Sequence, residues 1–218
     1  MSDINPGFIF ISLVVLAFSL SFHEMAHAWT ADRLGDPTAR ELGRVSMNPA
    51  VHVDPIGTIL FPLMSMLIQA AGARVGFIGW AKPVPIQVRH LAHPRRDVIL
   101  IALAGPASNI LLAIVIAIIW RLLAFVPAVD QSIGQPIVMF LVIGLYSNLG
   151  LAIFNLLPIP PLDGGKVLSN LLPLESGMAF DEFTGNYGFI ILYALMLTGI
   201  LTRIVSPPIT ILASLLLT

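Results

Sequence analysis

Residues 8–31, FIFISLVVLAFSLSFHEMAHAWTA, form an apolar run that ends in two histidines and a glutamate. As an α-helix, these 24 residues would extend about 36 Å, enough to cross a bilayer core of roughly 30 Å. We interpret the run as a retained transmembrane helix rather than a signal peptide, because it shows neither a basic leader nor a small-residue cleavage site. The stretch therefore predicts a membrane protein.

The composition of the whole chain agrees with that prediction. Of its 218 residues, 57% are hydrophobic and 11% are charged, and the mean hydropathy is +0.92. Soluble proteins carry about a quarter charged residues. The formal net charge is -1 and the arginines are scattered over loops, so we exclude nucleic acid as a partner. The chain has no cysteine, and nitrogen and oxygen atoms would have to hold any metal ion.

Further apolar stretches follow along the chain. They cover residues 56–73, 98–126, 137–157 and 188–201, with a short tail at 204–217. We expect an all-α polytopic membrane protein with five or six transmembrane segments in the lipid bilayer of the cell membrane. The last two stretches are the shortest, and Pro207 and Pro208 interrupt the tail. Because no linker or repeat divides the sequence, we predict one domain over residues 1–218.

The loop at residues 74–97 contains two short β-rich runs, VGFIGW at 75–80 and KPVPIQV at 82–88. Glycine and proline break these runs, which is typical of edge strands, and we expect a small membrane-associated β-hairpin. The alternative is an ordinary loop with an interfacial Trp80. Arginines are present both in this loop and in the loop at 32–54, so the positive-inside rule leaves the topology open.

The chemistry-bearing residues lie at the end of the first apolar run. His23 and His27 are four residues apart and share one face of a helix, with Glu24 beside them, a spacing typical of zinc hydrolases. A charged residue in a membrane helix costs on the order of 2.5 to 3.5 kcal/mol. Structural zinc sites in small peptides gain roughly 10 to 16 kcal/mol, so metal binding outweighs that cost. The alternative is that the cluster marks a helix end, with histidines at the interface.

Two histidines leave a catalytic zinc site one protein ligand short of the usual three. Candidates for the third ligand in or near apolar sequence are Asp163, His52 and Asp54. Asp163 is the strongest, because three prolines precede it and two glycines follow it at the end of a long apolar stretch. Irregular backbone at membrane depth occurs where it is buried in protein or lines a watery cavity. His52 is more typical of a hydrogen-bonding or interfacial residue.

Three motifs, in the same order along the chain, resemble those of the site-2 protease family of intramembrane zinc metalloproteases. The motifs are His23-Glu24-Met25-Ala26-His27, Gly105-Pro106-Ala107-Ser108-Asn109, and Asn155-x-x-Pro158-x-x-x-x-Asp163-Gly164. The resemblance covers roughly residues 13–172. It implies that His23, His27 and Asp163 bind zinc, and that Glu24 acts as general base and general acid.

The same resemblance implies a function. It predicts a zinc endopeptidase that hydrolyses peptide bonds within or next to transmembrane segments of membrane-protein substrates, using a zinc-activated water. Asn109 and Asn155 resemble family positions that bind substrate or the oxyanion, and the alternative is that such asparagines hold helices together. We also expect the predicted hairpin to capture an unwound substrate by strand addition.

Many relatives carry an inserted PDZ-type domain or an appended regulatory domain. No stretch of this chain is long and polar enough for either, so we expect a compact form of the family. Two other classes of protein remain as alternatives. One is a membrane metal-ion transporter, because intramembrane His and Asp also mark ion pathways. The other is a non-catalytic relative that binds transmembrane helices. The sequence leaves the natural substrate and the oligomeric state open.

Overall fold

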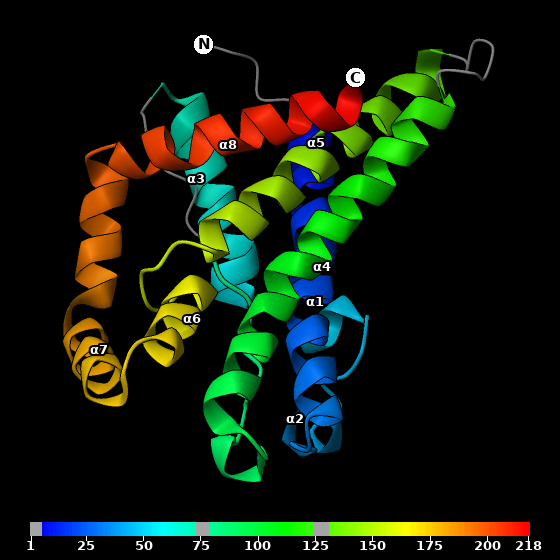
Figure 1. Ribbon diagram of the computed structural model, residues 1–218. Helices are drawn as coiled ribbons and strands as arrows, with labels where there is room; N and C mark the ends of the chain where they lie inside the picture. Colours follow the sequence, from blue (N-terminus) through cyan, green and yellow to red (C-terminus); the bar gives the residue numbers. More distant parts are fainter. Residues whose placement is uncertain (1–5, 73–78, 124–130) are drawn as a thin grey trace.

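Three long helices form the centre of the molecule. In the computed structural model, which describes residues 6–72, 79–123 and 131–218, α1 (Pro6–Arg33), α4 (Pro94–Leu123) and α5 (Gln131–Asn155) pack against one another (Figure 1). Many large apolar side chains on these helices are exposed on the outer surface, Leu111 of α4 among them, and face lipid in a membrane. The apolar side chains thus face outward, and buried polar residues such as His23, Asn109 and Asn148 lie inside the bundle.

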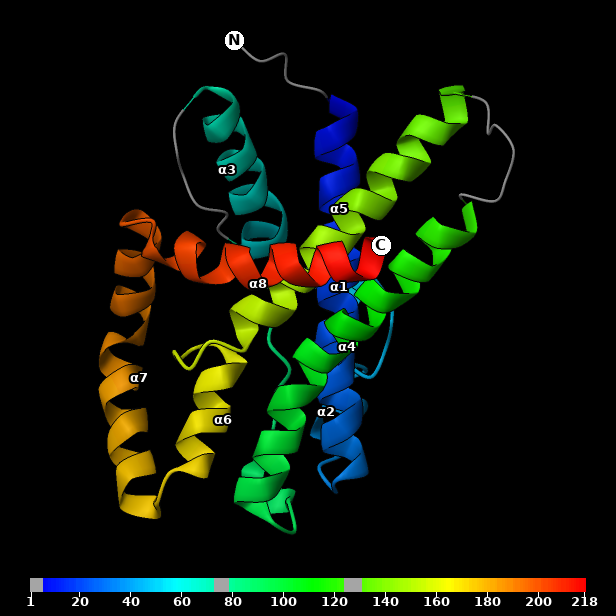
Figure 2. The same ribbon diagram turned by 45° about the horizontal axis from the view of Figure 1, so that its top comes forward.

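The shorter elements surround this centre. They are α2 (Thr38–Glu41), the 3₁₀ turns η1 (Pro49–Val51) and η3 (Val88–His90), the π-helix η2 (Pro55–Leu60), α3 (Phe61–Ala70), α6 (Asp163–Leu171), α7 (Leu174–Leu197) and α8 (Ile200–Leu217). The helix α8 lies across α4 and α5 in both views (Figures 1 and 2). Alanines at the contact, Ala113, Ala117 and Ala213, let the three helices approach closely.

Four of the described helices are long and apolar enough to cross a membrane by length and composition: α1, α4, Gly134–Asn155 of α5, and α8. The all-α membrane fold is thereby supported, but two of the expected spans differ. The stretch at 56–73 contributes a shorter apolar helix, Pro55–Gln69, made of η2 and α3. The stretch at 188–201 is the end of α7, followed by a left-handed Gly199 with a φ of 72° before α8 begins.

The predicted β-hairpin is wrong for the part of the loop that the structure describes. Residues 79–87 form no strand, and residues 73–78 lie outside the described ranges. The Trp80 N–H donates to the Gly57 carbonyl oxygen of η2 at 3.0 Å, and the Lys82 N–H donates to the His52 carbonyl oxygen in the loop before η2 at 2.9 Å. Pro83 and Pro85 have no N–H group with which to continue a ladder. The residues from 80 to 87, here called the 80–87 segment, therefore lie along η2 and the loop before it, without pairing in a sheet.

Asp36 ties the end of α1 to the 80–87 segment. Its fully buried carboxylate accepts hydrogen bonds from the Thr38 hydroxyl, from the Gln87 N–H at 2.6 Å and from His90 Nδ1 at 3.0 Å. Burial alone would raise the pKa of Asp36, but these hydrogen bonds outweigh it and lower the pKa below its ordinary value. The folded state therefore holds Asp36 ionised.

This lowered pKa predicts a pH-dependent contribution to stability. A carboxyl group whose pKa falls on folding stabilises the protein above its unfolded pKa, about 3.9, and loses that contribution as the pH drops through the folded pKa. We expect Asp36→Asn to unfold at a lower temperature than the wild type at about pH 6, with the gap closing below about pH 4. Thermal unfolding in detergent, followed by circular dichroism, measures this gap, and a gap that stays constant down to low pH contradicts the prediction.

Candidate metal centre

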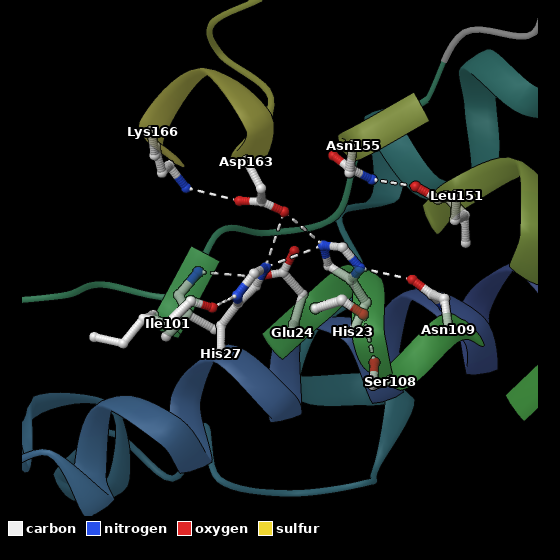
Figure 3. A network of polar contacts seen from close by, with 12 residues as sticks. His23, Glu24, His27, Ile101, Ser108, Asn109, Leu151, Asn155, Asp163 and Lys166 are labelled. Atoms are coloured by element: carbon white, nitrogen blue, oxygen red, sulfur yellow. Dashed lines mark hydrogen bonds and ion pairs between the residues drawn. The ribbon is translucent and has the colours of Figure 1, made fainter. Parts of the chain in front are cut away.

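The helix α1 and the start of α6 supply a cluster of three ligating side chains (Figure 3). The helix α1 presents His23 and His27 on one face, with their rings perpendicular and their Nε2 atoms 3.0 Å apart. Asp163, the first residue of α6, places its Oδ2 atom 3.1 Å from His23 Nε2 and 3.2 Å from His27 Nε2. All three side chains are buried. The structure thus brings together the residues that the sequence predicted as metal ligands.

Asp163 reaches the cluster through a tight backbone turn between α5 and α6. Residues 156–162 form irregular turns, and the two glycines after Asp163 allow α6 to fold back onto them. A Cβ atom on Gly164 would lie 2.3 Å from the Leu156 carbonyl oxygen, and one on Gly165 would lie 2.6 Å from Pro160 Cδ. The glycines are therefore required for close packing of α6 against its own preceding loop.

The helix α4 supports the histidines from the other side. A Cβ atom on Gly105 would lie 2.4 Å from His27 Nε2, so the absence of a side chain lets α4 pass directly over the two rings. One helical turn later, Asn109 Oδ1 lies 2.7 Å from His23 Nδ1. The Gly-Pro-x-x-Asn motif therefore combines a close approach and a polar contact on one helix face.

The hydrogen bonds of the two rings determine which nitrogen carries the proton. His27 Nδ1 lies 2.7 Å from the Ile101 carbonyl oxygen, which can only accept, so Nδ1 is the donor. Asn109 Nδ2 donates to the carbonyl of Ser19 and to Asn148 Oδ1, which turns Asn109 Oδ1 toward His23 Nδ1. His23 Nδ1 is then also a donor. Both Nε2 atoms therefore present lone pairs to the cluster.

This arrangement fits a bound cation. Two Nε2 lone pairs and a carboxylate oxygen face one another at 3.0 to 3.2 Å, and such acceptors repel unless positive charge lies among them. A tetrahedral zinc ion with bonds of about 2.0 to 2.1 Å would separate its ligand atoms by roughly 3.3 Å. Two imidazoles and one carboxylate are also a set of ligands that zinc accepts. The hydrogen bond at the Nδ1 atom of each imidazole holds the ring in its orientation.

The other two candidates for the third ligand lie elsewhere. The His52 Nε2–H donates to the Ser46 carbonyl oxygen at 2.8 Å, and burial lowers the pKa of His52 despite this hydrogen bond. Asp54 Oδ1 accepts from the N–H groups of Ile56 and Gly57 and caps η2. Both residues are structural parts of the loop before α3, and neither belongs to the His-His-Asp cluster.

The two asparagines predicted to bind substrate occupy different positions. Asn109 is fully buried and bonds to His23, Ser19 and Asn148, so its contacts favour an orienting role behind the histidine. Asn155 is half-buried and donates to the Leu151 carbonyl at 2.9 Å. Figure 3 places it on the same side of the rings as Asp163. A contact of either residue with substrate stays a prediction.

Replacing Asn109 distinguishes a role in orienting His23 from a role in binding substrate. Asn109→Leu leaves the His23 Nδ1–H without an acceptor, and we expect zinc to bind about 10- to 100-fold more weakly, as is usual when an outer hydrogen-bond partner of a ligand is lost. Competition with a chromophoric chelator measures the zinc Kd. Asn155→Leu is the matched control, for which we expect unchanged zinc affinity. An Asn109→Leu variant with normal zinc affinity and a raised KM would instead assign Asn109 to substrate.

Sequence reasoning missed several residues around the centre. Lys166 Nζ lies 3.1 Å from Asp163 Oδ1, which leaves Oδ2 free to face the histidines. Asn148 of α5 donates to the Ser19 hydroxyl and completes the network behind His23. A basic residue three positions after a helical aspartate, and a buried asparagine within an apolar run, are signals that could have indicated both.

Two buried histidines on a helix of membrane length, a glutamate after the first of them and a buried aspartate against both rings are the arrangement of a membrane metallopeptidase. The model of Peptidase family M50 matches residues 11–132 and 121–199 of the chain. The chain therefore belongs to peptidase family M50, the site-2 protease family, and is a zinc metalloprotease. This membership confirms the resemblance and decides against the metal-ion transporter.

Two relatives illustrate the similarity. The Bacillus subtilis (strain 168) protein named "Putative zinc metalloprotease YwhC" is 36% identical over 198 residues, which are 89% of this chain and 84% of the relative. The Mycolicibacterium smegmatis protein named "Putative zinc metalloprotease Rip2" is 31% identical over 200 residues, or 90% of this chain and 71% of the relative. No solved structure gave a significant match to the chain.

Proposed function

We propose that this chain is an intramembrane endopeptidase that cleaves peptide bonds within or next to transmembrane segments of other membrane proteins. The observation that carries the proposal is the position of the His-His-Asp cluster, which lies buried among helices of membrane length, with Glu24 on the same helix as both histidines. We propose further that it acts in the cell membrane as one domain over residues 1–218, with transmembrane proteins as its partners.

The side chains of the site have distinct roles in this proposal. His23, His27 and Asp163 hold the zinc ion, and Lys166 engages the Asp163 oxygen that faces away from the histidines. Zinc, when bound, supplies a Lewis acid that lowers the pKa of a water and polarises the scissile carbonyl. Glu24 takes the proton of the attacking water and passes a proton to the leaving amine as the C–N bond breaks.

The substrate must present an exposed peptide bond at this buried site. An intact helix uses its own carbonyl groups in internal hydrogen bonds, so a transmembrane substrate has to unwind locally before it is cleaved. Proline and glycine weaken helices, and segments that contain them unwind at lower cost. We therefore expect cleavage close to such helix-weakening residues.

The test uses the purified chain in lipid vesicles with a panel of single-span membrane proteins. Mass spectrometry of the fragments locates the cut, which we expect within or next to the transmembrane segment. Cleavage should stop on addition of a chelator and return with zinc. An unfolded soluble protein is the control substrate. Cleavage of that control in preference to the membrane panel contradicts the proposal.

A further inference from the structure

The Glu24 carboxylate has a backbone partner that lies far from it in the sequence. The N–H group of Val84, in the 80–87 segment, donates to Glu24 Oε2 at 3.2 Å. Pro83 and Pro85 flank Val84 and carry no N–H group, so Val84 supplies the one backbone donor between Pro83 and Pro85. The sequence Pro-Val-Pro thus presents a single amide to the glutamate.

The 80–87 segment is held on both sides of Val84 by bonds that do not involve the metal cluster. On one side, the Trp80 N–H donates to the Gly57 carbonyl oxygen of η2, and the Lys82 N–H donates to the His52 carbonyl oxygen. On the other side, the Gln87 N–H donates to the buried carboxylate of Asp36 at 2.6 Å. Val84 therefore meets Glu24 from a backbone whose position is set independently of the glutamate.

Arg44 fastens the part of the segment nearest to Glu24. Its guanidinium donates to the carbonyl oxygens of Lys82 and Pro83, the latter at 3.3 Å, and the side chain is 5% exposed. Burial lowers the pKa of Arg44 below its ordinary value, by more than the negative charge of the Glu24 carboxylate raises it. Beside it, the Lys82 N–H donates to the carbonyl of buried His52.

We propose that the Val84 N–H is a positioning donor that fixes the Glu24 carboxylate, and that Arg44 holds this donor in place through the Lys82 and Pro83 carbonyls. With Oε2 bonded to Val84, the carboxylate keeps one orientation and leaves Oε1 to accept the proton of water. A glutamate that is free to rotate would have to adopt that geometry in each turnover, and a misplacement of about 1 Å can cost roughly 100-fold in rate.

This inference rests on the proposed function for its catalytic part, but the contact itself is tested without any substrate. Between residues 82 and 85, Lys82 and Val84 have the exchangeable backbone amides, because prolines have none. Glu24→Ala removes the acceptor, and we expect hydrogen exchange of one of these two amides to become about tenfold faster. Glu24→Gln is the matched control, since the glutamine side chain keeps an acceptor oxygen. Unchanged exchange in Glu24→Ala overturns the proposal, whether or not the chain is a protease.

The catalytic part is tested with a pair of substitutions at one position. Val84→Pro deletes the N–H group in a backbone region that Pro85 already restricts to extended conformations, whereas Val84→Ala keeps the N–H and serves as the reference. Relative to Val84→Ala, we expect Val84→Pro to lower kcat by about 10- to 100-fold, with KM changed by less than about twofold. Zinc content should stay equal in the two variants.

Other outcomes of the kinetic comparison contradict the proposal. A difference of less than about twofold in kcat, a loss confined to KM, or a faster Val84→Pro enzyme would each overturn the positioning role. If Val84→Pro loses zinc or unfolds, the comparison moves to Arg44→Met and Arg44→Lys. We then expect Arg44→Met to lower kcat and to speed exchange at the Lys82 and Val84 amides, with Arg44→Lys restoring part of both. Equal behaviour of the two Arg44 variants and the wild type overturns the proposal.

Discussion

Glu24→Gln is expected to lower the rate of peptide cleavage by about 10²- to 10⁴-fold while zinc stays bound. Glutamine has the shape of glutamate and can still accept the Val84 N–H, but its amide cannot take a proton from water. Because the His23, His27 and Asp163 contacts do not involve Glu24, the metal content should not change. The measurement is fragment formation from a transmembrane substrate beside zinc analysis of the same preparation.

The control for this prediction is Glu175→Gln. Glu175 lies in the first turn of α7, outside the cluster, and its substitution should leave both the rate and the zinc content at the wild-type level. Wild-type cleavage by Glu24→Gln would show that Glu24 is not the general base. It would also remove the basis for the enzymatic mechanism proposed above.

Asp163→Ala is expected to weaken zinc binding by more than about 100-fold, beyond the loss usual for an outer hydrogen-bond partner. The substitution leaves two imidazoles where a catalytic zinc site uses three protein ligands. Equilibrium dialysis against buffered zinc measures the Kd, and cleavage should disappear at zinc concentrations that saturate the wild type. Lys166 loses its partner as well, but its side chain is half exposed and water can solvate it.

Asp54→Ala is the matched control for Asp163→Ala. Asp54 caps η2 through two backbone N–H groups, so its loss should destabilise the fold by about 1 kcal/mol and leave zinc affinity unchanged. Full zinc occupancy in Asp163→Ala would contradict the His-His-Asp site. In that case the metal would have to use other residues, and His52 would be the first to replace.

Much of the site could be predicted because its signals are local. The apolar run at 8–31 is long enough to cross a bilayer, and the i, i+4 spacing places His23 and His27 on one face of whatever helix forms there. The choice of Asp163 followed from the prolines and glycines around it, which indicate irregular backbone in an apolar region. These inferences need only the conformational propensities of the residues and the period of the α-helix.

The predicted hairpin is wrong for the described residues 79–88, because strand pairing depends on partners that sequence does not specify. The KPVPIQV stretch has the composition of an edge strand, yet the Lys82 N–H donates to the His52 carbonyl oxygen. The carbonyl oxygens of Lys82 and Pro83 accept from Arg44. Two prolines further reduce the donors available to a partner strand. The described part of this stretch is therefore held in place by Arg44 and contacts Glu24 through the Val84 N–H, and it does not form a sheet edge.

By itself, the sequence determined a helical membrane protein and predicted a zinc site at a pair of histidines with a neighbouring glutamate, since these follow from length, hydropathy and helical spacing. The tertiary structure alone decided how the distant residues meet at the site, and it added the Val84 contact to Glu24. Asp163 lies 140 residues from His23 in the chain, and Asn109 and Val84 are also remote from their partners. Such contacts arise from the packing of α4 against α1 and of α6 against α4, together with the 80–87 segment beside Glu24, where a buried polar group without a hydrogen bond costs free energy.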